Sequence, residues 1–307
     1  MRNKVIVIGS LNYDIILNLP RLPKRGETLP ALGASHVAGG KGANQAVQAA
    51  KLGVETYMAG CVGDDAMGNH LVQTAGKYDV KTDYIKIVSG ESGMGIVNAV
   101  QNGEVYATIV RGANFKVTKA EVDAIKPLMK EAEIVILQLE IPIEVVTYAI
   151  AAAKEMGCKV LLNAAPAVEI PEKYLTMCDI IIVNEMEASF YLKREITSIQ
   201  EAIEGADDMA RRWDAECIIT LGSAGSIVAY DNMNKVIPAD KVNAIDTTGA
   251  GDSFIGALSY GLIHDMTIVE ACEFATSCSA ITVCGIGAQS SMPYLADLDK
   301  SVLSNLN

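Results

Sequence analysis

The chain has 307 residues, of which 50% are hydrophobic and 20% are charged, so it can bury a substantial core and is not a disordered sequence. Its formal net charge of −12 argues against general binding to nucleic acids or anionic membranes, because those partners require basic surface. The seven cysteines form no C-x-x-C pair and the three histidines lie far apart, which excludes a disulfide framework and the familiar zinc spacings. The first apolar run, residues 5–8, is too short for a signal peptide or a membrane span, and we expect a cytoplasmic protein.

Short apolar runs alternate with helix-like segments along the chain. We expect strands at residues 5–8, 54–59, 134–139, 160–162, 180–183 and 218–221, and helices at 43–52, 66–77, 119–130, 144–156, 199–213 and 253–262. This alternation predicts a single α/β domain over residues 1–307, with a mainly parallel sheet covered by helices on both faces. Ligand sites are then expected at the carboxyl ends of the strands.

Two segments break the alternation. Residues 13–19 with 27–37, and residues 93–100 with 104–110, read as strands joined by turns, and Asn102-Gly103 is a strong hairpin signal. We expect a small inserted β-sheet, formed by about 12–38 and 92–112, that covers a site as a lid. The alternative is a pair of peripheral hairpins whose only role is packing.

The most informative stretch is Asp246-Thr247-Thr248-Gly249-Ala250-Gly251-Asp252, a glycine turn that leads into a helix with one apolar face. The start of such a helix offers unpaired N–H groups to an anion. A carboxylate at Asp252 would be unfavourable beside an anion unless it served as a general base during phosphoryl transfer. The alternative is a glycine-rich turn with an acidic residue that stabilises the helix start.

A second glycine turn, Gly39 to Gly42, also precedes a helix, and Lys41 and Asn44 could donate hydrogen bonds to a polyhydroxylated ligand. Asn12 and Asp14 follow the first strand and are two residues apart, so their side chains can point to one face. An amide and a carboxylate placed in this way can form hydrogen bonds with vicinal hydroxyls of a ligand. Glu140 follows another strand. Considered singly, these residues could equally form a tightly packed helix start, an Asx-turn and a helix cap.

The order and spacing of these motifs, together with Leu139-Glu140, Asn184 to Glu187 and Thr220 to Gly225, resemble the ribokinase-like carbohydrate kinases over nearly the whole chain. This resemblance implies a three-layer α/β/α fold and ATP-dependent transfer of a phosphoryl group to the 5-hydroxyl of D-ribose. Deoxyribose, another sugar or a nucleoside remain alternative acceptors, and a non-catalytic sugar- or nucleotide-binding regulator remains an alternative from another class. The chain has no P-loop signature.

The resemblance also implies roles for individual residues. Asp252 would be the general base, and the amides of Gly249, Ala250 and Gly251 would hold the transferred phosphoryl group. The sugar would be bound by Asn12, Asp14, Gly40, Lys41, Gly42, Asn44, Glu140 and Asp252. ATP would be bound by Asn184, Glu187, Thr220, Gly222, Ser223, Gly225, Gly251 and Thr276, of which Asn184 and Glu187 help to place Mg²⁺ through water.

Two further features follow from the resemblance. An activating monovalent cation, K⁺, would be bound by Asp246, Thr248, Thr282, Gly285, Gly287 and Ser291. The inserted sheets of two subunits would clasp one another in a homodimer. Tyr13, between the two proposed sugar ligands, is bulkier than the small residue often found there, and its effect on the sugar pocket is left open.

Overall fold

The computed structural model describes residues 2–101 and 104–298. A large central sheet is built from β1 (Lys4–Ile8), β4 (Glu55–Gly63), β5 (Lys81–Val88), β8 (Ala132–Leu137), β9 (Lys159–Asn163), β10 (Ile180–Asn184), β11 (Glu216–Thr220), β12 (Ser226–Tyr230) and β13 (Met233–Ile237). These nine strands lie in the order β13-β12-β11-β10-β9-β8-β1-β4-β5. The neighbours from β11 to β5 are parallel, while β12 pairs antiparallel with both β11 and β13. The expected mainly parallel sheet is therefore confirmed.

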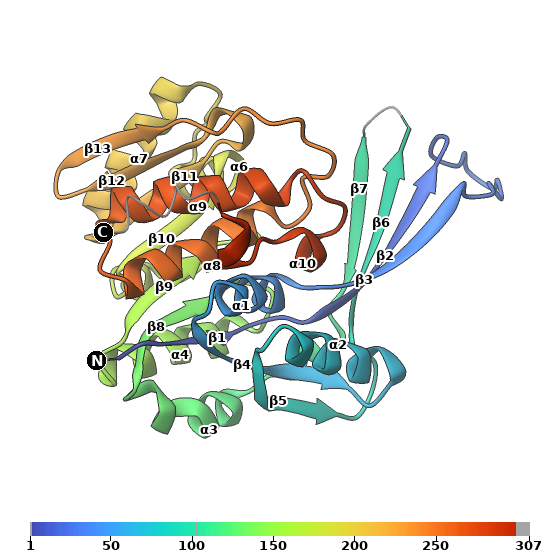
Figure 1. Ribbon diagram of the computed structural model, residues 1–307, viewed down its shortest axis with the longest axis horizontal. Helices are drawn as coiled ribbons and strands as arrows, with labels where there is room; N and C mark the ends of the chain where they lie inside the picture. Colours follow the sequence, from blue (N-terminus) through green and yellow to red (C-terminus); the bar gives the residue numbers. More distant parts are fainter. Residues whose placement is uncertain (1, 102–103, 299–307) are drawn as a thin grey trace.

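Helices cover both faces of this sheet (Figure 1). They are α1 (Lys41–Lys51), α2 (Ala66–Lys77), α3 (Lys119–Met129), α4 (Ile143–Glu155), α5 (Glu172–Leu175), α6 (Glu185–Leu192), α7 (Ile199–Trp213), α8 (Ala250–Ile263), α9 (Ile268–Thr282) and α10 (Ala288–Ser291). All the helices expected from the sequence are present, and α5, α6, α9 and α10 are additional.

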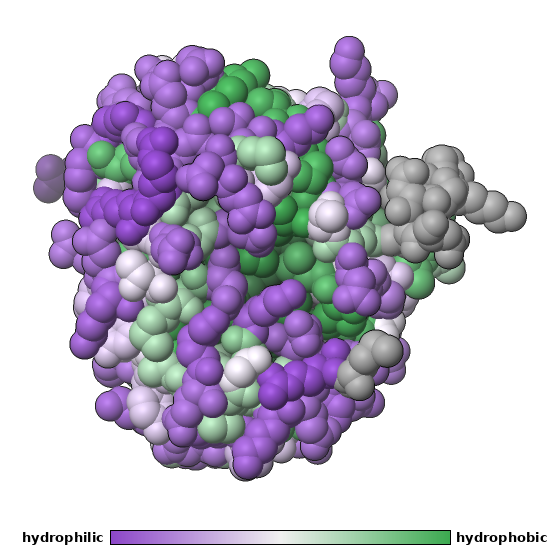
Figure 2. All heavy atoms as spheres, turned by 90° about the vertical axis from the view of Figure 1, so that its left-hand side faces the viewer, coloured by the Kyte–Doolittle hydropathy of each residue, from purple (hydrophilic) through white to green (hydrophobic). Residues whose placement is uncertain are grey.

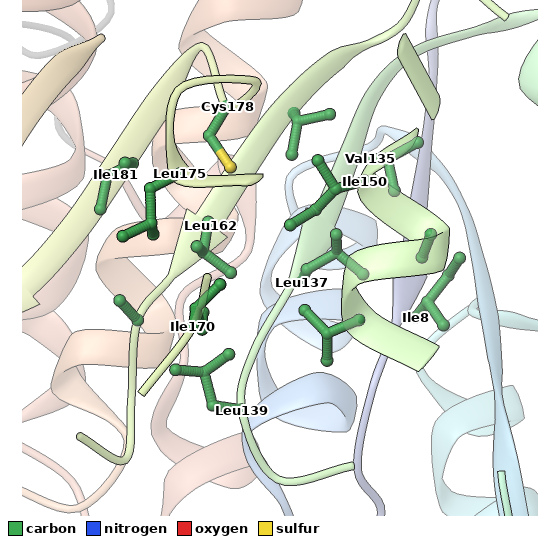
Figure 3. Close-up of a cluster of buried hydrophobic side chains, with 14 of the residues drawn as sticks. Ile8, Val135, Leu137, Leu139, Ile150, Leu162, Ile170, Leu175, Cys178 and Ile181 are labelled. Atoms are coloured by element: carbon green, nitrogen blue, oxygen red, sulfur yellow. The ribbon is translucent and has the colours of Figure 1, made fainter. Parts of the chain in front are cut away.

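Alternation along the strands creates two hydrophobic cores. Ile6 and Ile8 of β1 pack into the core that includes α3, α4, α6 and α7, whereas Val5 and Val7 pack into the core of α1, α2, α8 and α9. Figure 3 shows part of the first core, where Leu137 and Leu162 of neighbouring strands lie against Ile150 of α4. Both faces of the sheet are thus buried, as its nearly continuous apolar strands require.

The second sheet contains β2 (Asn12–Leu19), β3 (Gly33–Gly39), β6 (Gly93–Val100) and β7 (Val105–Val110), in the order β3-β2-β6-β7. It stands beside the core, at the carboxyl end of β1 (Figure 1). The expected strand at 27–37 begins only at Gly33. Pro20, Pro23 and Pro30 lie in the preceding segment, and proline cannot donate to a strand ladder. The predicted turn at Asn102-Gly103 lies outside the described residues, although β6 and β7 on either side pair antiparallel.

The opposite, amino ends of the parallel strands face the viewer in Figure 2. A hollow of about 1010 Å³ opens there, with Lys154, Asp179 and Glu216 among its charged lining residues and Leu262 and Ile268 among its apolar ones. It contains none of the residues proposed for the site. Within residues 2–101 and 104–298, no helix is both long and apolar enough to cross a membrane.

Candidate functional site

The two glycine turns meet beside the carboxyl end of β1. Gly40 adopts a φ of 89°, a conformation that glycine tolerates best, and a Cβ there would lie 2.6 Å from the backbone nitrogen of Asn12. A Cβ on Gly42 would lie 2.7 Å from the nitrogen of Ser10. The N–H of Ala43 donates to the carbonyl of Ser10 at 3.0 Å. These glycines therefore allow α1 to begin directly against the chain that leaves β1.

Asp252 lies in the first turn of α8 and is buried, with 8% of its surface exposed. Its Oδ2 accepts a hydrogen bond from Asn44 Nδ2 and its Oδ1 accepts one from Gln45 Nε2, both at 2.9 Å. Helix α8 begins at Ala250, and Gly249 just before it has a φ of 79°. The Ala250 N–H donates to the Thr247 carbonyl at 3.3 Å, which closes the turn that leads into the helix. Gly251 is exposed in the first turn of α8, where the backbone amides have no partner farther up the helix. The structure therefore places Asp252 next to this helix start, and the anion site there stays a prediction.

Lys41 and Glu140 lie close to this carboxylate. Burial alone would lower the pKa of Lys41, but the negative charges of Asp252, Glu140 and Glu187 raise it above its usual value. Glu140 Oε2 accepts hydrogen bonds from the Ser10 hydroxyl at 2.5 Å and from the backbone N–H of Lys41 at 3.3 Å. The ammonium group therefore stays charged among three carboxylates.

Asn12 and Asp14 lie at the start of β2, where the chain passes from the central sheet into the second sheet. Asn12 Oδ1 accepts from Asn114 Nδ2 at 2.7 Å, which fixes the orientation of its amide. The Asp14 carboxylate fits between strands that carry glycine, since a Cβ would lie 2.2 Å from it at Gly39 and 2.3 Å at Gly95. Burial first, and then the charge of Glu140, raise the pKa of Asp14 to about 6.

Tyr13 points away from these two side chains, because neighbouring residues of a strand face opposite sides. Its ring centroid lies 5.8 Å from that of His36 and 5.6 Å from that of His70 in α2. Tyr13 thus packs the second sheet onto the core. The structure gives it no place on the side of the sheet where Asn12 and Asp14 lie.

The residues predicted to bind nucleotide come from neighbouring strand ends, since Asn184 of β10 and Thr220 of β11 are paired in register. Asn184 and Glu187 form a capping box at the start of α6: Asn184 Oδ1 accepts from the Glu187 N–H at 2.9 Å, and Glu187 Oε2 accepts from the Asn184 N–H at 2.8 Å. Burial, and to a lesser extent Asp252, raise the pKa of Glu187, while Lys41 opposes the shift. Glu187 therefore faces the same charged centre.

The turn after β11 carries the other predicted nucleotide ligands. Gly222 and Ser223 are exposed, whereas Gly225 is buried with a φ of 99° and packs so tightly that a Cβ would lie 2.0 Å from the Ile237 carbonyl. Thr276 is buried in α9, and its hydroxyl donates to the Cys272 carbonyl at 2.8 Å. Gly222 and Ser223 are thus open to a ligand, while Gly225 shapes the turn.

Asp246 joins two of the loops proposed to bind a cation. Its Oδ1 accepts from the Thr248 N–H and its Oδ2 from the Gly287 N–H, each at 2.9 Å. Burial opposes ionisation, but these hydrogen bonds lower the pKa of Asp246. The hydroxyl of Ser291 donates to the Gly287 carbonyl, and that of buried Thr282 donates to Ser253 Oγ at 2.8 Å. The predicted ligands Asp246, Gly287 and Ser291 therefore come together, and Gly285 lies within contact of Ser291.

Sequence reasoning gave no role to four side chains that support the site. Ser10 donates a hydrogen bond to Glu140, and Asn114 donates one to Asn12. Gln45 donates to Asp252, and Gln289 donates to Asn44. A signal for Gln45 was available: Gln45 and Gln48 are three residues apart, so the predicted helix carries two amide side chains on one face. Asn114 gives no such signal, because the 3₁₀ helix Gly112–Lys116 brings it to Asn12 only in the folded chain.

A buried carboxylate at the start of a helix, beside a glycine turn, is an arrangement suited to phosphoryl transfer onto a hydroxyl group. A model of the pfkB family of carbohydrate kinases matches residues 2–295, and the chain belongs to this family. It is therefore a sugar kinase with a ribokinase-like α/β fold.

Individual relatives extend over the same length. A ribokinase from Schizosaccharomyces pombe is 36% identical, with 97% of each chain covered. A deoxyribokinase from Salmonella typhi is 32% identical and covers 98% of this chain and 99% of its own. Among solved structures, that of an Arabidopsis thaliana ribokinase complexed with ribose and ATP has a TM-score of 0.87 and 31% identity, covering 100% of this chain and 99% of its own.

The raised pKa of Asp14 gives a test of the site in the absence of ligands. A carboxyl with a folded-state pKa near 6 destabilises the fold progressively as the pH rises from about 4 to about 6, because only the unfolded chain ionises freely in that range. Asp14→Asn should therefore increase the free energy of unfolding at pH 7.5 by about 1 kcal/mol, after allowance for solvent screening. Urea unfolding at pH 4 and pH 7.5 measures the difference.

Asp246→Asn is the matched control, because hydrogen bonds lower the pKa of Asp246. Its ionised form contributes stability that is present above the unfolded pKa and is lost on acidification. This variant should be less stable than the wild type at pH 7.5. Equal stability of wild type and Asp14→Asn at both pH values would contradict the assignment of a half-buried carboxylate with a raised pKa at Asp14.

Proposed function

We propose that the protein catalyses ATP-dependent phosphorylation of the 5-hydroxyl of D-ribose, giving ribose 5-phosphate. The observation that carries this proposal is the meeting of Asp252, at the start of α8, with the sugar-binding candidates at the start of α1 and on β2. Similarity to ribokinases over the full length supports ribose as the acceptor. The free thiols of the seven cysteines agree with a cytoplasmic enzyme.

In this reaction Asp252 accepts the proton of the attacking hydroxyl, and the amides of Gly249, Ala250 and Gly251 hold the γ-phosphoryl group. Asn12, Asp14, Asn44 and Glu140 orient the sugar, together with the backbone of Gly40 and Gly42 and the ammonium of Lys41. Since phosphoryl transfer depends mainly on positioning and charge stabilisation, no covalent intermediate on the protein is needed. The second sheet acts as a lid that excludes water and prevents hydrolysis of ATP.

The nucleotide lies against the turn after β11 in this proposal, with Thr220, Gly222, Ser223, Gly225 and Thr276 lining its site. Asn184 and Glu187 would hold Mg²⁺ through water, and Mg²⁺ bound with ATP supplies neutralisation of phosphate charge. The buried carboxylate of Glu187, close to Lys41 and Asp252, fits that task.

Deoxyribose is the second candidate acceptor, because a deoxyribokinase is also similar over its full length. The two sugars differ by a single hydroxyl. Discrimination between them therefore depends on whether a buried polar group of the site is left unpaired when that hydroxyl is missing.

The general base is tested with Asp252→Asn, which keeps the size of the side chain and removes its basicity. Turnover of ATP with ribose should fall by roughly two to four orders of magnitude, while the sugar continues to bind. A coupled ADP assay gives turnover, and isothermal titration gives ribose affinity. Unchanged turnover would refute this mechanism, and a panel of ribose, deoxyribose, hexoses and nucleosides identifies the acceptor.

Activation by K⁺ is the next prediction. The carbonyls of Thr248, Thr282, Gly285 and Gly287, with Asp246 and Ser291, form an oxygen-only set that suits K⁺, and the contacts of Asp246 with both loops explain how a cation would stabilise the anion-binding turn. K⁺ should accelerate turnover more than Na⁺ at equal ionic strength. Equal rates in both salts and in cation-free buffer would remove Asp246 from the functional site.

We also propose a homodimer in which the second sheets of two subunits pack together. Ile15, Leu17 and Ile96 share one face of that sheet with Tyr106, which is 44% exposed. A four-stranded sheet without a core of its own gains stability by covering such a face. Sedimentation at micromolar concentration should give twice the chain mass of 32.6 kDa. A monomer would overturn this proposal, and Ile15→Lys should dissociate the dimer.

A further inference from the structure

One face of α1 carries amide side chains where a helix core normally carries apolar ones. Asn44, Gln45 and Gln48 are at most 6% exposed, and all three face α8 or α10. Buried amides are retained only where their hydrogen bonds are made. Two of them, Asn44 and Gln45, donate to the same carboxylate, that of Asp252.

Two chains of hydrogen bonds between amide side chains, called relays here, start at Asp252. The first relay runs from Asp252 through Gln45 to Gln138 at the end of a central strand. Gln45 Nε2 donates to Asp252 Oδ1 at 2.9 Å, and Gln45 Oε1 accepts from Gln138 Nε2 at 2.6 Å. Gln138 directly follows β8 and is fully buried. Its Oε1 lies against Gly9, where a Cβ would approach it to 1.8 Å. Glycine at position 9 therefore makes room for the outer end of the relay.

The second relay runs from Asp252 toward α10. Asn44 Nδ2 donates to Asp252 Oδ2 at 2.9 Å, and Asn44 Oδ1 accepts from Gln289 Nε2 at 3.0 Å. The backbone of Gln289 is held in turn, because its carbonyl accepts from the buried ammonium of Lys51 at 2.7 Å. Each carboxylate oxygen thus receives one amide donor that is itself held by a second amide.

The direction of both relays is dictated by charge. An ionised carboxylate only accepts hydrogen bonds, so Gln45 and Asn44 must turn their NH₂ groups toward it and their oxygens away. Gln138 and Gln289 must then donate through their own NH₂ groups, and their oxygens point away from the relay and have no hydrogen-bond partner. Among the described residues, these two oxygens are two of only four buried side-chain polar atoms that lack a hydrogen bond. Such atoms are unfavourable and call for an explanation.

We infer that Gln45, backed by Gln138, is a positioning residue that holds the Asp252 carboxylate in the orientation needed for proton abstraction, with Asn44 and Gln289 holding the second oxygen. This inference rests on the proposed function of Asp252 as the base. During transfer the hydroxyl proton moves to an Asp252 oxygen, the new O–P bond forms and the bond to the leaving ADP breaks. Because each oxygen of Asp252 already accepts one amide donor, the carboxylate is held against rotation about its Cβ–Cγ bond before the sugar arrives.

Other charged groups also act on Asp252. Lys41 of α1, Glu187 of α6 and Asp14 of β2 interact with it electrostatically, and Glu140 acts on Lys41 and Asp14. A neutral substitution at position 45 leaves all of them in place. A change in the carboxyl signal of Asp252 in that variant therefore reports the lost amide donor.

The test compares Gln45→Met with Gln48→Met. Gln48 is the matched control, since it is equally buried on the same helix and bonds Ser253 at 2.9 Å and the Pro293 carbonyl at 3.1 Å instead of Asp252. NMR of ¹³C-labelled aspartate carboxyls, with the Asp252 signal assigned by its loss in Asp252→Asn, reports the surroundings of this carboxylate in each protein. Gln45→Met should move the Asp252 carboxyl signal, because it removes one of the two amide donors, and Gln48→Met should leave the signal unchanged.

Kinetics provide the second readout. In Gln45→Met, kcat should fall about tenfold with KM for the sugar within about twofold. An unchanged Asp252 carboxyl signal in Gln45→Met, or an equal change in Gln48→Met, would overturn the inference. If Gln45→Met does not fold, Gln138→Met replaces it, with a smaller change of the Asp252 signal expected and an unchanged signal counting against the relay.

The NMR comparison does not depend on activity. It therefore separates failure of the relay from failure of the proposed function, which would appear as wild-type protein that phosphorylates no sugar.

Discussion

The close approach of α1 and α8 is the constraint on which the rest of the site depends. Gly256 makes it possible, because a Cβ there would lie 2.6 Å from Gln48 Cβ and 2.7 Å from the Gln45 carbonyl. Gly42 brings the other end of α1 equally close to the chain leaving β1. With side chains at these positions the helices would separate, and Asp252 would lose its contacts with Asn44 and Gln45. Backbone packing thus fixes the distance between the proposed base and the proposed sugar site.

The carboxylates of the site differ because their surroundings differ. Asp14 is half-buried near Glu140, and loss of solvent and that charge raise its pKa to about 6, whereas the pKa of Asp246 is lowered by hydrogen bonds from Thr248 and Gly287. The environment of Asp14 suits a carboxylate that accepts hydrogen bonds from the hydroxyls of a ligand, and that of Asp246 suits a permanent link between two loops. Lys41 compensates part of the negative charge gathered around Asp252. The separation of roles follows from environment, since the residue type is the same.

Much of this arrangement could be predicted from the sequence. Periodicity located α2 and α7 with the same bounds as the structure, and the glycine turns marked both helix starts that form the site. The edge elements were missed: β5 alternates with charged residues, and the hairpin of β12 and β13 turns at Asp231-Asn232 without a glycine, both residues having positive φ. The capping box of Thr267 and Glu270 could have located α9. Contacts such as Asn114 with Asn12 depend on tertiary structure and leave no local pattern.

The central claim is that one carboxylate, Asp252, lies between two substrates bound at the two glycine turns. A crystal structure with ribose and a non-hydrolysable ATP analogue tests it most directly. The account predicts the sugar 5-hydroxyl within hydrogen-bond distance of Asp252, with the γ-phosphate held by the amides of Gly249 to Gly251. A sugar bound with a different hydroxyl at Asp252, or a γ-phosphate held away from those amides, would contradict it.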